Sequence, residues 1–156
     1  AMMPFGEMHL LREIIASADS AIAAGAPAAN LRFGHEVFFL PLVCLMELGN
    51  SAPRIDNVRD IAEQWRSYEL FPMACNIQLV FYRKKGSADP GDILVKALLN
   101  EREVAMPVSS GLAPYYKWRD VRDYYTGKLD AFEKAHPDLM PEIPGDYLPG
   151  RLKKNL

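Results

Sequence analysis

The sequence predicts an α/β fold in which a small mixed sheet with a C-terminal hairpin is covered by helices. Apolar residues recur three and four positions apart over residues 7–24, which is the helical period. Residues 76–83 instead alternate in the two-residue period of a strand. At 156 residues the chain is long enough to bury one core. We predict a single domain over residues 1–134, followed by a Pro/Gly-rich tail over residues 135–156.

Two helices are expected in the first third of the chain. The apolar pattern of residues 7–24 ends at Gly25-Ala26-Pro27, a helix-terminating sequence. Residues 37–48 are almost entirely apolar, so this second helix should be buried on most of its sides. Its Pro41 should lie in or near the first turn, where a missing backbone N–H costs little.

The remaining elements are shorter. We expect strands at 31–34, 76–83, 93–99 and 103–106. A tight turn at Asn100-Glu101 should join the last two strands. Further helices are expected over 55–65 and from Pro114 to 132. Together with the two helices above, these elements predict one layer of strands and one of helices.

Composition excludes several classes of function. The net charge of −2 and the pI near 5.9 argue against a nucleic-acid partner, because nucleic-acid-binding proteins normally carry a basic stripe. No apolar run approaches the roughly 20 residues of a membrane helix, and the first residues do not resemble a secretory signal. Cys44 and Cys75 are expected to be free thiols. The chain has no Cys/His cluster or Gly-rich phosphate loop, so we expect no metal and no cofactor.

The candidate site is the dipeptide His35-Glu36, which falls where the expected strand 31–34 ends and a helix begins. Free backbone N–H groups and the helix dipole favour anions at a helix N-terminus, so a phosphate would fit there. The alternative is that the pair only caps the helix. The other histidines, His9 and His136, are expected on the surface or at a helix end, and Arg32 is expected to be solvated or salt-bridged.

Four collinear segments carry a family resemblance. The stretch Leu31-Arg32-Phe33-Gly34-His35-Glu36 with Leu40-Pro41-Leu42 resembles the second signature of the histidine acid phosphatases, in particular the multiple inositol polyphosphate phosphatase and phytase branch. Residues 71–82 resemble the family's strand after its variable insert, 93–101 its closing hairpin, and 114–118 the start of its last helix. The resemblance extends from about residue 7 to residue 125.

The resemblance implies a phosphomonoesterase mechanism and a role for each residue of the pair. In this family a histidine within an Arg-His-Gly signature attacks phosphorus, and arginines hold the phosphate oxygens. By resemblance, His35 contacts the phosphate and Glu36 protonates the leaving alcohol, which lowers the barrier because an alkoxide is a poor leaving group. An acid in this role should lie in a partly buried pocket.

Two departures from the family pattern limit the functional prediction. Many relatives carry His-Asp and the inositol polyphosphate branch often carries His-Ala-Glu, whereas this chain has His35-Glu36-Val37. No Arg-His dipeptide occurs in the 156 residues, so the nucleophile signature is missing. The resemblance therefore implies the C-terminal fragment of an inositol polyphosphate or phytate phosphatase, inactive alone. The alternative is a non-catalytic oligomeric interaction module that reuses the scaffold.

The same resemblance implies partners. Part of the family's central sheet comes from its N-terminal segment, so the fragment should expose sheet edges and an apolar face. We expect a homo-oligomer, a swapped assembly or a complex with a separate N-terminal segment, and a phosphate or phosphomonoester as ligand. Full-length relatives are expected to be periplasmic or secreted, although this chain carries no signal peptide of its own.

Overall fold

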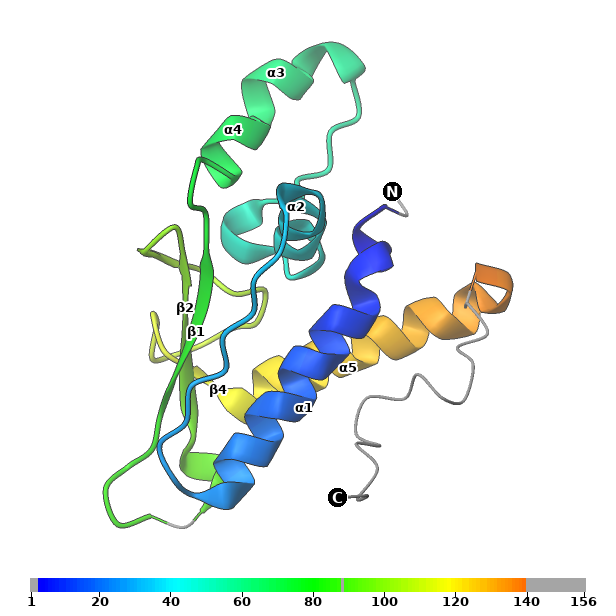
Figure 1. The fold of residues 1–156 in the computed structure, drawn as a ribbon. Coiled ribbons are helices and arrows are strands. Elements are labelled where there is room, and N and C mark those ends of the chain that lie inside the picture. The colour runs from blue at the N-terminus through cyan, green and yellow to red at the C-terminus, as the bar shows by residue number, and fades with distance from the viewer. Residues whose placement is uncertain (1–2, 88, 140–156) are drawn as a thin grey trace, which may run out of the picture.

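Helices and strands form two layers in the computed structural model, which describes residues 3–87 and 89–139 (Figure 1). The long helices α1 (Met8–Ala24) and α5 (Trp118–Ala135) lie on one side of the sheet, and α2 (Glu36–Leu45) lies on the same side near its other end. The expected α/β class is therefore confirmed. α5 reaches Ala135, and a 3-10 turn follows at Pro137–Leu139.

Helix α1 matches its expected range closely. A 3-10 turn at Met3–Glu7 leads into it, and Met8, Leu11 and Ile15 are buried at helical spacing. Gly25 ends the helix with φ of 72°, and its N–H donates to the carbonyl of Ile22 at 3.2 Å. Glycine adopts this left-handed geometry without the steric cost of a side chain, so Gly25 serves as the C-cap.

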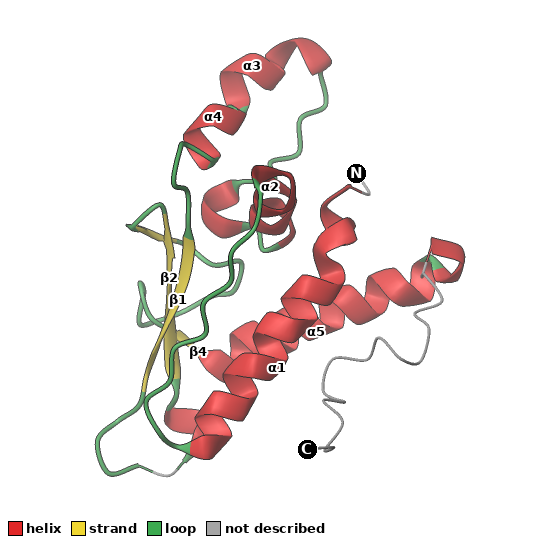
Figure 2. Ribbon diagram, viewed as in Figure 1, coloured by secondary structure: helices red, strands yellow, loops and turns green. Residues whose placement is uncertain are grey.

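The sheet is wholly antiparallel, so the predicted mixed sheet is wrong (Figure 2). Its strands are β1 (Ile77–Tyr82), β2 (Leu94–Leu99), β3 (Arg102–Val104) and β4 (Tyr116–Lys117). The order of the strands is β1-β2-β3. The short β4 also pairs with β2, at residues 94–95, whereas β3 pairs with residues 97–99. Strands joined by short turns reverse direction, whereas a parallel neighbour needs a crossover connection, and the described residues place none within this sheet.

The predicted hairpin is confirmed. Leu99 pairs with Arg102, and the two residues between them, Asn100 and Glu101, have φ of 51° and 66°. Two positive φ values are the signature of a type I′ turn, whose twist suits a two-residue hairpin. The Asn100 amide also accepts from the N–H of Asn76 at 3.1 Å and donates to the carbonyl of Leu70 at 2.9 Å. This turn therefore fixes the start of β1 as well as the hairpin.

Three other expected elements differ in the structure. Residues 31–34 form no strand, because they have no ladder neighbour among the described residues to take up their backbone hydrogen bonds. The expected helix 55–65 shortens to a 3-10 turn at Val58–Asp60 and α3 (Ile61–Gln64), and α4 (Ser67–Leu70) follows. None of these turns has a buried residue, so burial of an apolar face does not support a longer helix here.

Two prolines lie elsewhere than expected: Pro114, expected as the first residue of a helix, and Pro41, expected in or near a first turn. The last helix starts at Trp118 and not at Pro114, because Tyr116 and Lys117 pair with β2 first. Pro41 lies in the interior of α2, which begins at Glu36. Its ring leaves the carbonyl of Val37 without an intrahelical donor, a cost that solvent offsets at the exposed Val37.

The core lies between the sheet and the helices. Its residues with at most 1% exposure come from α1, the 43–48 segment, β2 and α5: Leu11, Val43, Leu45, Met46, Leu48, Val95, Ala97, Val121, Tyr125 and Leu129. The Tyr125 hydroxyl donates to the carbonyl of Met46 at 2.8 Å, and the Trp118 indole N–H donates to Asp19 at 2.7 Å. Each buried polar tip therefore has a partner, as burial requires.

Candidate functional site

His35 and Glu36 lie at the N-terminus of α2, as the sequence predicted. His35 is the N-cap residue, with φ of −94° and ψ of 163°. Its carbonyl accepts from the N–H groups of Phe38 at 3.1 Å and Phe39 at 3.3 Å. The imidazole makes no capping hydrogen bond. The backbone of His35 therefore starts the helix without help from its side chain.

The helix N-terminus is open to a ligand. The backbone N–H groups of Glu36 and Val37 have no acceptor among the described residues. Helix α2 is ten residues long, so its dipole places partial positive charge at this end. An imidazole, a carboxyl group and two N–H donors thus belong to the first residues of one helix, where the backbone favours an anion.

The surroundings of the pair differ from the expected pocket. His35 and Glu36 are both exposed, so the predicted partly buried acid is wrong for this chain by itself. The apolar neighbours are also exposed: Leu31 retains 77% of its accessible surface, Phe33 92% and Val37 62%. Large apolar side chains that remain this exposed are candidates for covering by a partner when they form a patch. The site therefore consists of the exposed first residues of α2 and is not enclosed by other described residues.

Arg32 points away from this site. Its guanidinium donates to the Ser17 hydroxyl at 2.7 Å and to the carbonyl of Glu13 at 3.2 Å, both on α1. These bonds attach the 26–34 segment to α1 and leave Leu31 and Phe33 on the outside. Arg32 therefore positions the segment that precedes His35.

The other histidines lie apart from the site. His9 is exposed on α1. His136 follows α5, where its Nδ1 lies 3.1 Å from the carbonyl of Phe132 and its ring stacks on the Phe132 ring. The predicted surface and helix-end positions are thus confirmed for both.

The described residues contain no group of three or more His, Cys, Asp or Glu side chains arranged to hold a metal ion. None of their helices is long and apolar enough to cross a membrane. Cys44 and Cys75 are free and half-buried. Burial raises the pKa of the Cys44 thiol, and its sulfur lies 3.5 Å from the carbonyl oxygen of Ser51, so Cys44 packs as a structural thiol.

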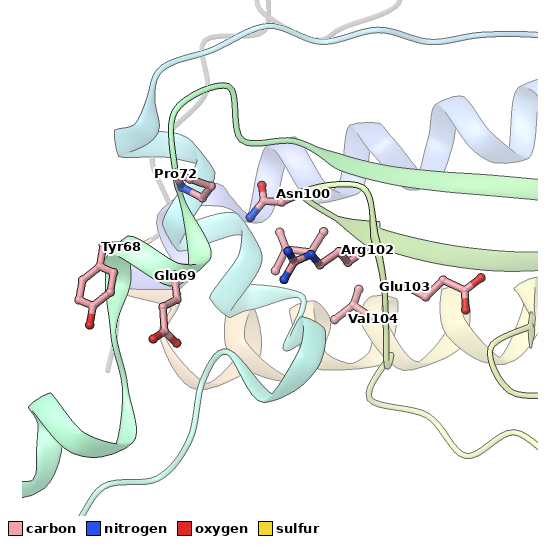
Figure 3. Close-up of a pocket in the computed structure, with 8 residues that line it drawn as sticks. Tyr68, Glu69, Pro72, Asn100, Arg102, Glu103 and Val104 are labelled. Carbon is pink, nitrogen blue, oxygen red and sulfur yellow. The ribbon is translucent and has the colours of Figure 1, made fainter.

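A concave feature that sequence reasoning missed lies between α4 and the β2–β3 hairpin (Figure 3). It is an open depression of about 480 Å³, lined by Tyr68, Glu69, Pro72, Leu99, Asn100, Arg102, Glu103 and Val104. Glu69 pairs with Arg66 at 3.3 Å and Glu103 with Lys96 at 2.7 Å. The lining thus carries two carboxylates that are each paired with a cationic side chain, together with the Arg102 guanidinium, and no contact in the structure assigns this depression a ligand.

Comparison with known proteins adds no assignment: neither the protein-family models nor the curated proteins searched include a match to this chain. The geometry of the α2 N-terminus and the motif resemblance are therefore the observations on which a function can be proposed.

Proposed function

We propose that this chain is the C-terminal, proton-donor part of a phosphomonoesterase of the inositol polyphosphate or phytate type, and that it is inactive alone. The observation that carries the proposal is the exposed His35-Glu36 pair at the N-terminus of α2, beside two N–H groups without acceptors among the described residues. These are groups that bind a phosphoryl oxygen and supply a proton. The resemblance of residues 31–42 to a phosphatase signature supports the reaction class.

In the proposed reaction, Glu36 acts as the general acid and His35 as a phosphate contact. The nucleophile attacks phosphorus, the bond from phosphorus to the alcohol oxygen breaks, and Glu36 transfers its proton to that oxygen. The resulting carboxylate then takes a proton from the water that releases phosphate. His35 and the N–H groups of Glu36 and Val37 stabilise the charge on the phosphoryl oxygens.

The phosphoryl acceptor has to come from another polypeptide segment. The sequence contains no Arg-His dipeptide, so it lacks the family's nucleophile signature. The exposed side chains of Leu31, Phe33 and Val37 are close to the pair in sequence and give such a segment apolar area to cover. Covering them would also exclude water from Glu36, which strengthens its interaction with a substrate.

A non-catalytic interaction module is the second candidate. The same exposed apolar residues favour it, since they suit a protein partner without any phosphate chemistry. In this case His35 and Glu36 are simply the residues at which α2 begins. The two candidates differ in whether the α2 N-terminus binds a phosphorylated ligand.

Ligand titration followed by NMR distinguishes them. With phytate or inorganic phosphate, we expect saturable shifts of the His35 imidazole and of the Glu36 and Val37 amides. Because the site is exposed, the affinity should be weak, with a Kd on the order of 1 mM. His9, exposed on α1, is the internal control and should not saturate with them. His35→Ala should abolish the amide shifts. Equal responses of His9 and His35, or none, would reject the phosphatase proposal and favour the interaction module.

A further inference from the structure

The β2–β3 hairpin places Arg102 beside apolar side chains on the face of the sheet that turns toward the helices. Arg102 lies opposite Leu99 in the ladder, and Val104 lies opposite Ala97. Opposite residues of an antiparallel pair project from one face, and so do residues two apart on a strand. Ala97 belongs to the buried core, so this face is the inner one. Leu99 and Val104 thus form an apolar floor beside Arg102, where the core meets the depression of about 480 Å³.

Two contacts hold the walls of this depression in place. The amide nitrogen of Asn100 donates to the carbonyl of Leu70 at 2.9 Å, which joins the hairpin to the last residue of α4. Val104 packs closely against the turn after α2, since its Cγ2 atom lies 2.5 Å from the position of a Cβ atom at Gly49. Sites for small ligands are usually formed before the ligand arrives, and these contacts meet that condition.

Arg102 brings a positive charge that no other described side chain balances. Glu69 pairs with Arg66 at 3.3 Å and Glu103 pairs with Lys96 at 2.7 Å, so each carboxylate of the lining already has a cation. Figure 3 shows the Arg102 side chain extending toward α4, whereas that of Glu103 extends away from it. Among the described residues, no side chain forms a hydrogen bond or an ion pair with the Arg102 guanidinium. The lining therefore carries one unpaired positive charge.

We propose that this depression binds an organic carboxylate that carries an apolar group, as a small acid or the C-terminal residue of a polypeptide does. The planar guanidinium of Arg102 presents parallel N–H donors, which match the two oxygens of a carboxylate. The apolar group lies against Leu99, Val104 and Pro72, which supply the apolar part of the lining. One unpaired positive charge is complementary to a monoanion, whereas a phosphate dianion would retain a charge without a partner.

The size of the depression and its far wall suit an aromatic or branched apolar group. Its volume of about 480 Å³ falls within the roughly 300–1,000 Å³ that is usual for sites of small ligands. Tyr68 lines the α4 side and retains 66% of its accessible surface, so its ring offers the ligand further apolar area. The inference is independent of the proposed function, because residues 31–37, which include His35 and Glu36, contribute nothing to this lining.

Titration with a matched acid and amide, followed by NMR, tests the proposal. The probe is hydrocinnamate, and hydrocinnamamide has the same shape without the charge. With the acid we expect saturable shifts of the Leu99 and Val104 methyl groups and of the Arg102 Nε–H signal. The amide should bind about tenfold more weakly or less, because it loses the charge-assisted hydrogen bonds. N-acetylphenylalanine distinguishes the two sources: binding tighter than that of hydrocinnamate indicates a polypeptide C-terminus, and binding no tighter indicates a small acid.

Variants of Arg102 separate its charge from its shape. Arg102→Gln should weaken binding of hydrocinnamate about tenfold or more, and Arg102→Lys, which keeps the charge without the planar fork, should fall between the two. Arg59→Gln is the matched control, since Arg59 is also exposed but does not line the depression, and it should leave the affinity unchanged. Circular dichroism checks that each variant is folded. Equal affinity for acid and amide, unchanged affinity in Arg102→Gln, or inorganic phosphate that competes as well as the acid would overturn the proposal.

Discussion

Substitution of Gly49 by alanine should destabilise this protein more than its size suggests. Gly49 has φ of 59° and its N–H donates to the carbonyl of Ala105 at 3.0 Å, so it attaches the turn after α2 to the chain leaving β3. A Cβ atom at this position would lie 2.5 Å from Cγ2 of Val104. Neither the backbone conformation nor the available space suits alanine.

The magnitude has two parts. A non-glycine residue in the left-handed region costs about 1 kcal/mol. Forcing a methyl group against the Val104 side chain in a packed region adds about 1–3 kcal/mol. We therefore expect Gly49→Ala to lower the free energy of unfolding by roughly 2–4 kcal/mol. Gly86, with φ of 79° and no neighbour within 4 Å of its Cβ position, isolates the first part and should lose only about 1 kcal/mol.

Urea unfolding followed by circular dichroism measures the difference. Gly127→Ala, in the open interior of α5, is the opposite control and should stabilise by about 0.5–1 kcal/mol. Adding Val104→Ala to Gly49→Ala should relieve the contact, so the double variant should lose less than the sum of the single losses. Equal losses for Gly49→Ala and Gly86→Ala would refute the contact between Gly49 and Val104.

Three further predictions concern the other contacts of the fold. Burial, and then the hydrogen bond to Glu47, raise the pKa of Tyr124 from 10 to about 12. The contribution of this hydroxyl to stability is therefore present below pH 10 and is lost as the pH rises from 10 through 12. The melting temperature of Tyr124→Phe should accordingly fall less steeply over this range than that of the unsubstituted chain. The Trp65 indole donates to the carbonyl of Ser51 at 2.7 Å, so Trp65→Phe should cost about 1 kcal/mol and speed protease cleavage within residues 53–64. Arg32→Ala should speed cleavage within residues 26–34 in the same limited proteolysis assay, with unchanged cleavage at 53–64 as its control.

Elements with a strong local pattern were predictable from the sequence. The period of residues 7–24 describes a face that α1 buries, and the alternation of residues 76–83 describes a row that β1 half-buries, so both elements appear close to their expected limits. The Asn100-Glu101 turn followed from the two strands on either side of it. The position of His35-Glu36 at a helix N-terminus followed from the onset of an apolar run.

Features that depend on a neighbour were not predictable in this way. Residues 31–34 have the composition of a strand, but a strand forms only where another backbone pairs with it. The exposure of Glu36 likewise depends on what lies opposite it, which a local motif does not encode. The positive φ of Glu47 and its ion pair with the distant Lys128 reflect the docking of α2 against α5 and leave no local sequence signal.

Phosphate release tests the central claim most directly. The purified chain and its Glu36→Gln variant are incubated with phytate and with an aryl phosphate at acidic pH, and inorganic phosphate is measured. The account predicts no release by either protein, because the chain holds the proposed acid and lacks the nucleophile signature. Release by the chain that disappears in Glu36→Gln would show that it supplies its own phosphoryl acceptor, which would contradict the claim that it is inactive alone.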